Sequence, residues 1–361
     1  MAFEVIMGPD LRIIVSHKKQ SAYGTYLPHA NFETGMAIRL NTATVGDVSI
    51  LRSPGTPRAG SHTEFPVADN ERKVGQDSKL SIAMDCESFM AGWGLAFLMG
   101  GVASAQEGAT THWTHTFTCT DPLSASGRNV LITSAYLDTG GPDGTRLIRI
   151  IPDLTPMSLS LSGKGKDVVQ LAIEMVGSGR ETTDQILSPF PALMTQTLYA
   201  NDGVKLEVGA KGGGLTDFTE RLSEWSISFH QELALDQGYY PGSGYYRGRL
   251  WFIRRFFTID FALYASRANR DFIDDMLLRT LKEVKITIDS GVVPGTGTGT
   301  HKIVARYPSC RFSEAPMVFN PEGALYQVKV ADDQVYIDSA IAASPCTVVV
   351  DNVQSAYLAA P

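Results

Sequence analysis

The stretch from residue 157 to 176 restricts the fold of this chain more than any other. It reads MSLSLSGKGKDVVQLAIEMV, with apolar residues at every second position on both sides of a turn that contains Gly163 and Gly165. A period of two places alternate side chains on opposite faces of a β-strand, whereas a helix needs apolar residues three and four apart. We therefore expect an antiparallel hairpin with one buried face and one polar face.

Residues 80–121 form a second restrictive stretch, LSIAMDCESFMAGWGLAFLMGGVASAQEGATTHWTHTFTCTD. It predicts a strand, a short apolar helix closed by Gly100 and Gly101, a loop of Gly, Ala and Ser residues, and a second strand at 113–118. Asp85 is expected to cap the first turn of the helix. The helix carries no charge after Glu87, so it must be covered on most sides.

The second half of the chain repeats this order. Residues 256–264, 266–283 and 284–289 are expected to form strand, helix and strand, and each half continues with a strand that ends at a proline (Pro152, Pro308) and a hairpin. At 361 residues the chain is longer than one ordinary core organises. The pattern predicts a mainly β protein of two tandem β-domains of similar topology, residues 1–190 and 191–361, with a linker at residues 178–202. Each domain is expected to contain one helix that lies across a β-sheet.

Composition narrows the classes of partner. Charged residues make up only 19% of the chain, and the net charge is −7. Tight phosphate binding needs clustered Lys and Arg, so we do not expect tight binding of nucleic acid. The four cysteines are far apart and predict buried free thiols. The N-terminus does not resemble a secretion signal and no apolar run is long enough to span a membrane, so we expect a chain made in a cytoplasm that stays soluble.

Motifs for chemistry are weak throughout. His112 and His115 are three residues apart on a predicted strand. This odd spacing places their side chains on opposite faces, so they are poor joint ligands for a metal ion. The lysines of SGKGKD at 162–167 lie in a hairpin turn and lack the phosphate-loop pattern. We therefore expect no catalytic residue, no cofactor and no metal, and predict that the protein is not an enzyme. The segment QGYYPGSGYYRGR at 237–249 suggests a buried subunit contact. The alternative is a surface that binds nucleic acid or sugar by stacking, with Tyr245 and Tyr246 as the residues that would hold a glycan.

Two polar segments, residues 41–76 and 291–301, interrupt the strands. The first is too long for a structureless loop inside a compact domain, so an extended β-arm or hairpin is expected at its ends, although a mobile surface loop is the plainer alternative. As an arm, the first segment would reach a neighbouring subunit, whereas the second is expected to be a flexible loop. If both bridge neighbouring subunits or adjacent rings, the candidate contact residues are Ser53, Pro54, Arg58, His62, Thr296 and Thr298.

Several of these motifs, taken in order, resemble the tail tube proteins (major tail proteins) of long-tailed bacteriophages. The resemblance rests on KKQSAYGT near the N-terminus, the apolar helix ending in LMGG, HWTHTFTCTD after it, and the hairpin SLSLSGKGKDVVQLAIEMVGSGRE. It covers most of the first 180 residues, and the second half follows more loosely.

The resemblance implies that each domain is a β-sandwich or β-barrel with a flanking α-helix. It also implies a structural virion protein that assembles into stacked, β-lined rings around a DNA channel. The polar face of the 157–176 hairpin would then line the channel, with Ser158, Ser160, Gln170 and Glu174 as candidate lumen-facing residues. Partners would be other copies of the chain, other tail proteins and passing double-stranded DNA, with no membrane; the chain would reside in the virion tail after assembly in the host cytoplasm. If each chain supplies two tube domains, a trimer with pseudo-six-fold symmetry is favoured over a hexamer. A tail-tip, baseplate or capsid-decoration ring protein is the alternative within this class, and a β-sandwich carbohydrate-binding module is the alternative outside it.

Overall fold

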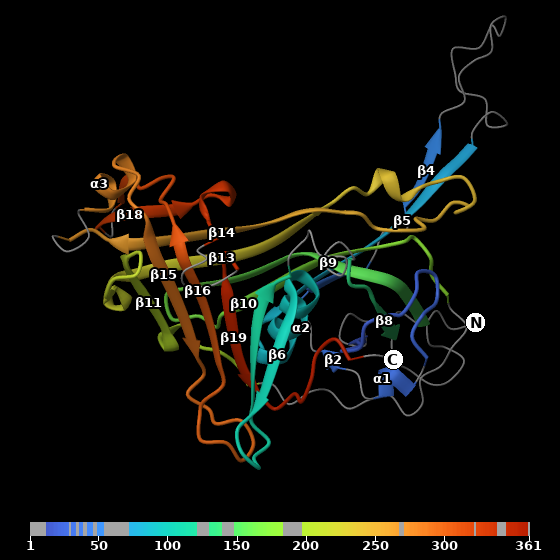
Figure 1. The fold of residues 1–361 in the computed structure, drawn as a ribbon, viewed down its shortest axis with the longest axis horizontal. Coiled ribbons are helices and arrows are strands. Elements are labelled where there is room, and N and C mark those ends of the chain that lie inside the picture. Colours follow the sequence, from blue (N-terminus) through green and yellow to red (C-terminus); the bar gives the residue numbers. More distant parts are fainter. Residues whose placement is uncertain are drawn as a thin grey trace, which may run out of the picture.

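The structure is a computed structural model that describes residues 12–28, 30–33, 36–38, 42–45, 49–53, 72–120, 130–138, 148–182, 197–266, 271–320, 323–337 and 344–359. Most of the described part of the chain is antiparallel β-sheet, as the alternation predicted. Two sheets stack face to face, and their strands cross at a steep angle (Figure 1). Both sheets are open, so the barrel alternative is wrong and the sandwich is correct at this level.

The larger sheet follows a path of eight strands, β17-β18-β14-β13-β9-β10-β5-β3. Off this path, β4 pairs with the first part of β5. Strand β8 pairs with the first part of β9, β1 pairs with β8, and β2 pairs with β1. The bounds are β1 (Arg12–Val15), β2 (Met36–Ile38), β3 (Thr42–Val45), β4 (Ser49–Ser53), β5 (Arg72–Asp85), β8 (Thr133–Asp138), β9 (Ile148–Lys164), β10 (Gln170–Gly177), β13 (Leu222–Leu233), β14 (Phe252–Tyr264), β17 (Met317–Asn320) and β18 (Gly323–Val330). A short helix, α1 (Ala30–Glu33), lies between β1 and β2.

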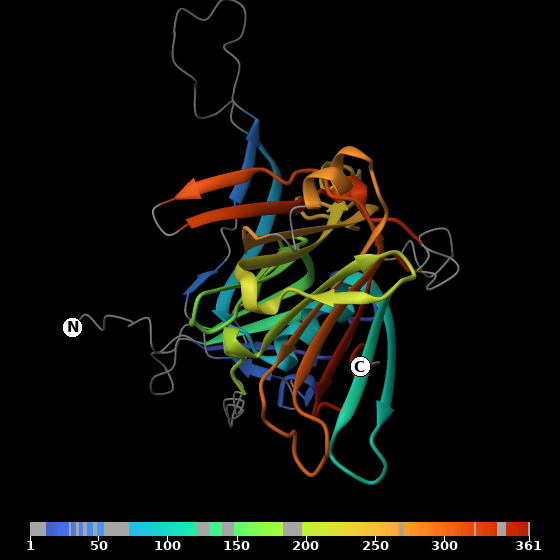
Figure 2. The same ribbon diagram turned by 90° about the vertical axis from the view of Figure 1, so that its left-hand side faces the viewer.

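The smaller sheet has seven strands in the order β12-β11-β15-β16-β19-β7-β6. Figure 2 shows two long turns of this sheet projecting side by side from its lower end, one between β6 and β7 and one between β15 and β16. The bounds are β6 (Gly100–Gln106), β7 (Trp113–Cys119), β11 (Val204–Ala210), β12 (Leu215–Asp217), β15 (Lys282–Asp289), β16 (Lys302–Cys310) and β19 (Thr347–Asn352).

The predicted hairpin is confirmed as β9 and β10. Leu161 pairs with Leu171 and Leu159 with Ile173, and all four side chains are buried. The expectation that Pro152 and Pro308 each end a strand is wrong, because β9 continues through Pro152 and β16 continues through Pro308. Asp153 adopts a positive φ of 59°. The pairing of β9 with β8 ends at Leu154 and its pairing with β10 begins at Thr155, so the missing proline N–H falls where the pairing changes.

Helix α2 (Ser88–Met99) lies between the two sheets, against β9 on one side and β7 and β19 on the other. Its residues are buried all round except Phe89, which confirms that the uncharged helix is covered. It ends at Gly100 with a φ of 83°, as predicted for a glycine cap. Two details are wrong. Asp85 is the last residue of β5 and does not cap the helix, and the Gly/Ala/Ser segment is strand β6, which pairs with β7.

Helix α3 (Phe272–Leu277) is much shorter than the helix predicted at 266–283. Arg279 has a positive φ of 53°, which stops the helix, and Glu283 lies inside β15 opposite Gly209. Glu283 is buried there and accepts a hydrogen bond from Arg306 Nε at 2.7 Å. Sheet pairing thus overrides the helical pattern of charges in this segment.

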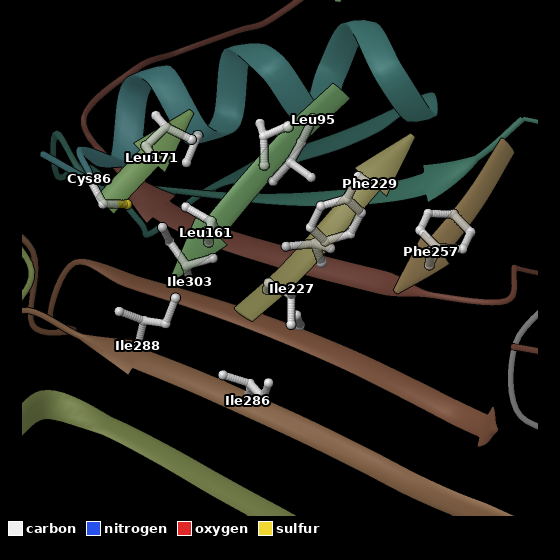
Figure 3. Packing of buried hydrophobic residues seen from close by; sticks show 14 of the residues in the cluster. Cys86, Leu95, Leu161, Leu171, Ile227, Phe229, Phe257, Ile286, Ile288 and Ile303 are labelled. Carbon is white, nitrogen blue, oxygen red and sulfur yellow. The ribbon is translucent and has the colours of Figure 1, made fainter. Parts of the chain in front are cut away.

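One apolar core fills the space between the sheets. Leu161, Ile227 and Phe257 of the larger sheet face Ile286 and Ile303 of the smaller sheet (Figure 3). Strands from both predicted domains contribute to each sheet, through the pairs β9–β13 and β7–β19. The predicted boundary near residue 190 lies outside the described residues, and the division into two domains stays a prediction.

All four cysteines are free, and three are fully buried, as the sequence predicted. Among the described residues no helix is long and apolar enough to cross a membrane.

Candidate assembly and channel surface

The outer face of the larger sheet is polar across both halves of the chain. On β9 the serines at 158, 160 and 162 alternate with buried leucines, and on β13 Ser226 and Ser228 alternate with buried Ile227 and Phe229. Because β9 and β13 pair with Ser160 opposite Ser228, the two polar rows form one continuous surface. The alternation with a period of two therefore determines which side chains point away from the core.

This polar face is hollowed. A hollow of about 780 Å³ spans β5, β10, β9, β13, β14 and β18. Residues from all six strands line it, including Asp85, Gln170, Ser162, Ser226, Asp260 and Gln327. A second hollow of about 330 Å³ lies further along the same strands and is lined by Ser158, Glu174, His230 and Arg254.

Acidic groups outnumber basic ones in the larger hollow. Its carboxylates belong to Asp85, Asp167, Glu224, Asp260 and Glu314, and its ammonium groups to Lys164 and Lys329. Lys164 is partly neutralised by Glu224, with Nζ and Oε2 3.3 Å apart. Such a surface repels the phosphates of nucleic acid more than it binds them.

Burial shifts the pKa values of two side chains on this face. It raises the pKa of the Asp260 carboxyl above its usual value, although Lys329 lowers it in part. Burial likewise lowers the pKa of the His230 imidazole, against the opposing effect of Glu174. Around them, Gln170 Nε2 donates to Asp85 Oδ1 at 2.9 Å and Ser158 Oγ donates to Glu174 Oε2 at 3.3 Å.

The structure brings the four predicted lumen residues onto this one face. Gln170 lines the larger hollow, and Ser158 and Glu174 line the smaller one. Ser160 lies between them on β9, opposite Ala172. Sequence reasoning missed the second-half residues of the same surface, Asp260 and Gln327. Their alternation with buried Ile259, Phe261, Val328 and Val330 was the signal that could have found them.

Both ends of the eight-strand path have a free edge within the described part of the chain. There β17 pairs only with β18, and β3 pairs only with β5. The Gln327 N–H donates to the Pro316 carbonyl at 3.0 Å. The backbone N–H and C=O groups at the even-numbered positions of β17 therefore point towards β18. The N–H groups of Met317 and Phe319 therefore point away from the sheet. A row of outward N–H and C=O groups is a template for pairing with another strand.

The predicted arm residues fall into two groups. Ser53 ends β4, opposite Arg72 of β5, so the start of the 41–76 segment is a β-hairpin as predicted. Pro54, Arg58 and His62 lie outside the described residues, as does the strand-like end at 63–67. Thr296 and Thr298 lie in the 290–301 loop, which is bonded to the β6–β7 turn of the same chain.

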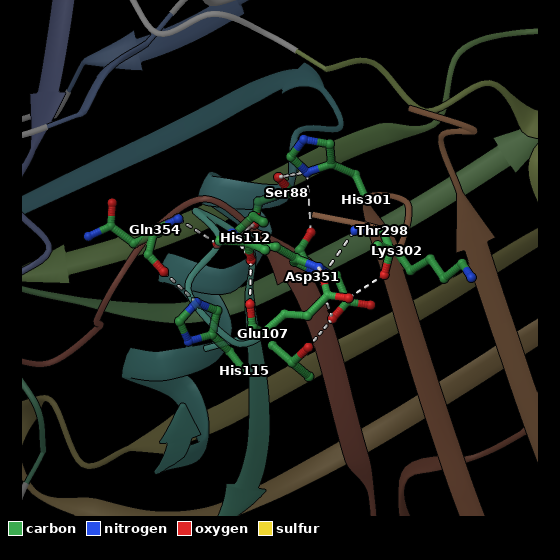
Figure 4. Close-up of polar contacts among 12 residues, drawn as sticks. Ser88, Glu107, His112, His115, Thr298, His301, Lys302, Asp351 and Gln354 are labelled. Atoms are coloured by element: carbon green, nitrogen blue, oxygen red, sulfur yellow. Dashed lines mark hydrogen bonds and ion pairs between the residues drawn. The ribbon is translucent and has the colours of Figure 1, made fainter. Parts of the chain in front are cut away.

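That clasp between two loops is built on Glu107 (Figure 4). Its carboxylate accepts hydrogen bonds from the backbone N–H of Thr298, at 3.0 Å, and from the Thr298 hydroxyl. It also lies 2.7 Å from His112 Nδ1. The Thr298 hydrogen bonds, together with His112, lower the pKa of the Glu107 carboxyl to about 2. His112 is therefore paired within the chain, and the nearby His115 Nε2 lies 2.8 Å from the Gln354 carbonyl.

The Tyr/Gly segment closes the turn between β13 and β14. Tyr245 is exposed, whereas Tyr246 is only half-exposed and lies beneath the Arg180 guanidinium, with 5.3 Å between the Arg180 Cζ and the ring centroid. Arg247 is buried and forms an ion pair with Asp77, with Nη2 and Oδ1 2.5 Å apart. This segment is thus held firmly against β5.

Compared with known proteins, the chain matches no family model, and no curated protein matches it.

Proposed function

We propose that this chain is a structural subunit of a bacteriophage tail tube, which assembles into β-lined rings around a DNA channel. The observation that carries the proposal is the hollowed, acidic face of the larger sheet, which ends in a free strand edge on each side. Closing such a sheet into a ring removes its edges and turns the polar face inward. An acidic wall then lets DNA pass without holding its phosphates.

The strand order supports a ring built from repeated units. Read from one end, the path is β3-β5-β10-β9 and then β13-β14-β18-β17. In each group a strand that precedes a helix (β5, β14) lies second and the strand of the late hairpin (β10, β18) lies third. Gln170 and Gln327 occupy the third strand of their groups and face the same hollow. Two tandem units joined at β9–β13 account for this order.

The internal junction is a template for the junction between chains. Strand β3 pairs with β5 in the first group as β13 pairs with β14 in the second. When β5 and β14 are aligned, Thr42-Ala43-Thr44-Val45 of β3 corresponds to Ser226-Ile227-Ser228-Phe229 of β13, with the same alternation of polar and apolar residues. The edge at β17 of one chain would then pair with β3 of the next, as β9 pairs with β13. Three chains would supply six such units, so a trimer with pseudo-six-fold symmetry is favoured.

Electron microscopy of the purified protein at rising concentration tests the proposal. We expect rings with a central channel, three-fold averages and six similar lobes. Met317→Pro removes an outward N–H without touching the β17–β18 ladder and is expected to abolish the rings. Met317→Thr keeps the N–H and is the matched control. Wild-type protein that stays monomeric at all concentrations, or Met317→Pro rings equal to those of the control, would contradict the proposal.

A further inference from the structure

Six of the large apolar side chains that the described residues expose form two groups away from the polar sheet face. One group lies at the turn between β13 and β14 and is called here the aromatic tip: Tyr240, Tyr245, Trp251 and Ile253. Another pair, Leu277 and Leu278, lies at the end of α3. These leucines are 69% and 77% exposed, far more than a helix that packs by its apolar side normally leaves uncovered.

The two surfaces lie at opposite ends of the same strand pair. Strands β13 and β14 run from the aromatic tip to the Leu222–Leu263 pair, and α3 follows directly beyond β14. Figure 1 shows α3 at one end of the long axis and the β13–β14 hairpin extending towards the other. In a ring made by side-by-side pairing of strands, the strand ends form the two rims. The aromatic tip and α3 would then occupy opposite rims.

Both surfaces are held in place before any partner binds. Under the aromatic tip, Arg247 Nη1 donates to the Gly177 carbonyl at 3.0 Å and Tyr239 Oη donates to the Gln76 carbonyl at 2.8 Å. Beside α3, Lys282 Nζ lies 2.6 Å from Asp275 Oδ2, and the buried Phe272 ring anchors the helix. Surfaces fixed in this way lose little conformational entropy on binding.

Their chemistry is complementary and different. The aromatic tip carries the exposed Arg249, whose guanidinium lies over the Trp251 ring at 5.0 Å. Helix α3 carries aliphatic side chains, and around it two exposed carboxylates, Asp271 and Asp274, outnumber one exposed guanidinium, Arg279. Tyr, Trp and Arg are the residues most enriched at protein interfaces. An aromatic surface with a positive charge fits an aliphatic surface with a negative charge better than it fits a second copy of itself.

We infer that the aromatic tip of one copy docks on the exposed end of α3 of a copy in the next ring. This inference rests on the proposed ring and names the surfaces that stack one ring on another. A contact between two different surfaces is heterologous, and when it repeats along an axis it produces an open filament. Rings joined in this way grow into a tube with a single polarity.

Two blocked variants test the inference. The helix-blocked variant carries Leu277→Asp and Leu278→Asp, and the tip-blocked variant carries Trp251→Asp and Ile253→Asp. Each is expected to form rings but to lose stacking, with the mean number of rings per tube reduced at least about tenfold at a fixed concentration. Ile337→Asp places the same charge on an exposed isoleucine outside both surfaces and is the control, with tubes of wild-type length. Electron microscopy counts rings per particle, and sedimentation velocity measures their mass.

Mixing the two variants gives the sharper result. Each variant retains the surface that the other lacks, so a mixture is expected to form stacks of two rings and nothing longer. Stacks of two in the helix-blocked variant alone would mean that tip meets tip, and tubes of wild-type length in both variants would mean that other surfaces stack; either result overturns the inference while leaving the ring intact. Loss of rings in a blocked variant would place its surface in the lateral contact and also overturn it. Wild-type protein without rings would instead defeat the proposed function itself.

Discussion

Replacing Glu87 by Gln is expected to stabilise the protein at neutral pH. Glu87 lies directly before α2 and is only 2% exposed. Burial raises the pKa of its carboxyl to about 8, and the backbone N–H groups of Met90 and Phe89 lower it only in part. The folded protein therefore binds a proton that the unfolded chain releases above about pH 4.5.

The sign and size of the effect follow from this difference. A raised carboxyl pKa costs nothing below the unfolded value, and the cost grows as the pH rises from about 4.5 to about 8. At about 1.4 kcal/mol per pH unit, the cost at pH 7 is about 3 kcal/mol. Glutamine keeps an oxygen that can accept the two N–H groups but carries no charge. The variant should thus gain at most about 3 kcal/mol at pH 7 and nothing near pH 4.

Urea unfolding followed by tryptophan fluorescence, at a concentration too low for assembly, measures this gain between pH 4 and pH 8. Glu224→Gln removes a carboxylate from the polar face and reports what the loss of one surface charge does by itself. A Glu87→Gln gain that is the same at pH 4 and pH 7, or a variant less stable than wild type at pH 7, would refute the reasoning.

Two further predictions concern the loops and the channel. Glu107→Gln should release the clasp, because the depressed carboxyl pKa of about 2 means that its stabilisation is present above about pH 4.5 and is lost as the pH falls towards 2. Hydrogen exchange at the Thr298 amide measures this, with loss of protection in the variant at pH 6; unchanged protection would show that the carboxylate does not hold the loop. Ser160→Lys with Gln170→Lys should make the acidic face bind double-stranded DNA, with an affinity that falls steeply as salt rises, in a gel-shift titration. Thr216→Lys on β12 is the control away from this face, and equal binding by both variants would argue against a channel on the larger sheet.

Much of the strand content could be predicted because its signal is local. The alternation in β7, β9, β10 and β13 identifies both the strand and the side that faces the core, and Gly100 marks the end of α2 through its own backbone geometry. The same alternation placed Ser158, Ser160, Gln170 and Glu174 on the polar side of the hairpin. These features need no knowledge of distant residues.

Other elements depend on partners that the local sequence does not reveal. The small residues of β6 carry no periodic pattern, and they form a strand because β7 pairs with them. Strand β9 accommodates Pro152 because its pairing changes next to Asp153. Helix α3 is shorter than predicted because Glu283 pairs within β15. In each case long-range strand pairing overrides the local conformational preference of the sequence.

The sequence by itself determined which side chains would be buried and which would be exposed along most strands. Only the tertiary structure decided that Asp85, Gln170, Ser162, Ser226, Asp260 and Gln327 line one hollow. These residues come from six strands whose order along the sheet is β5-β10-β9-β13-β14-β18. The order of strands also left β3 and β17 at the free edges. A period of two is a property of each strand's own backbone, whereas the choice of neighbour is set by burying one shared core between the two sheets.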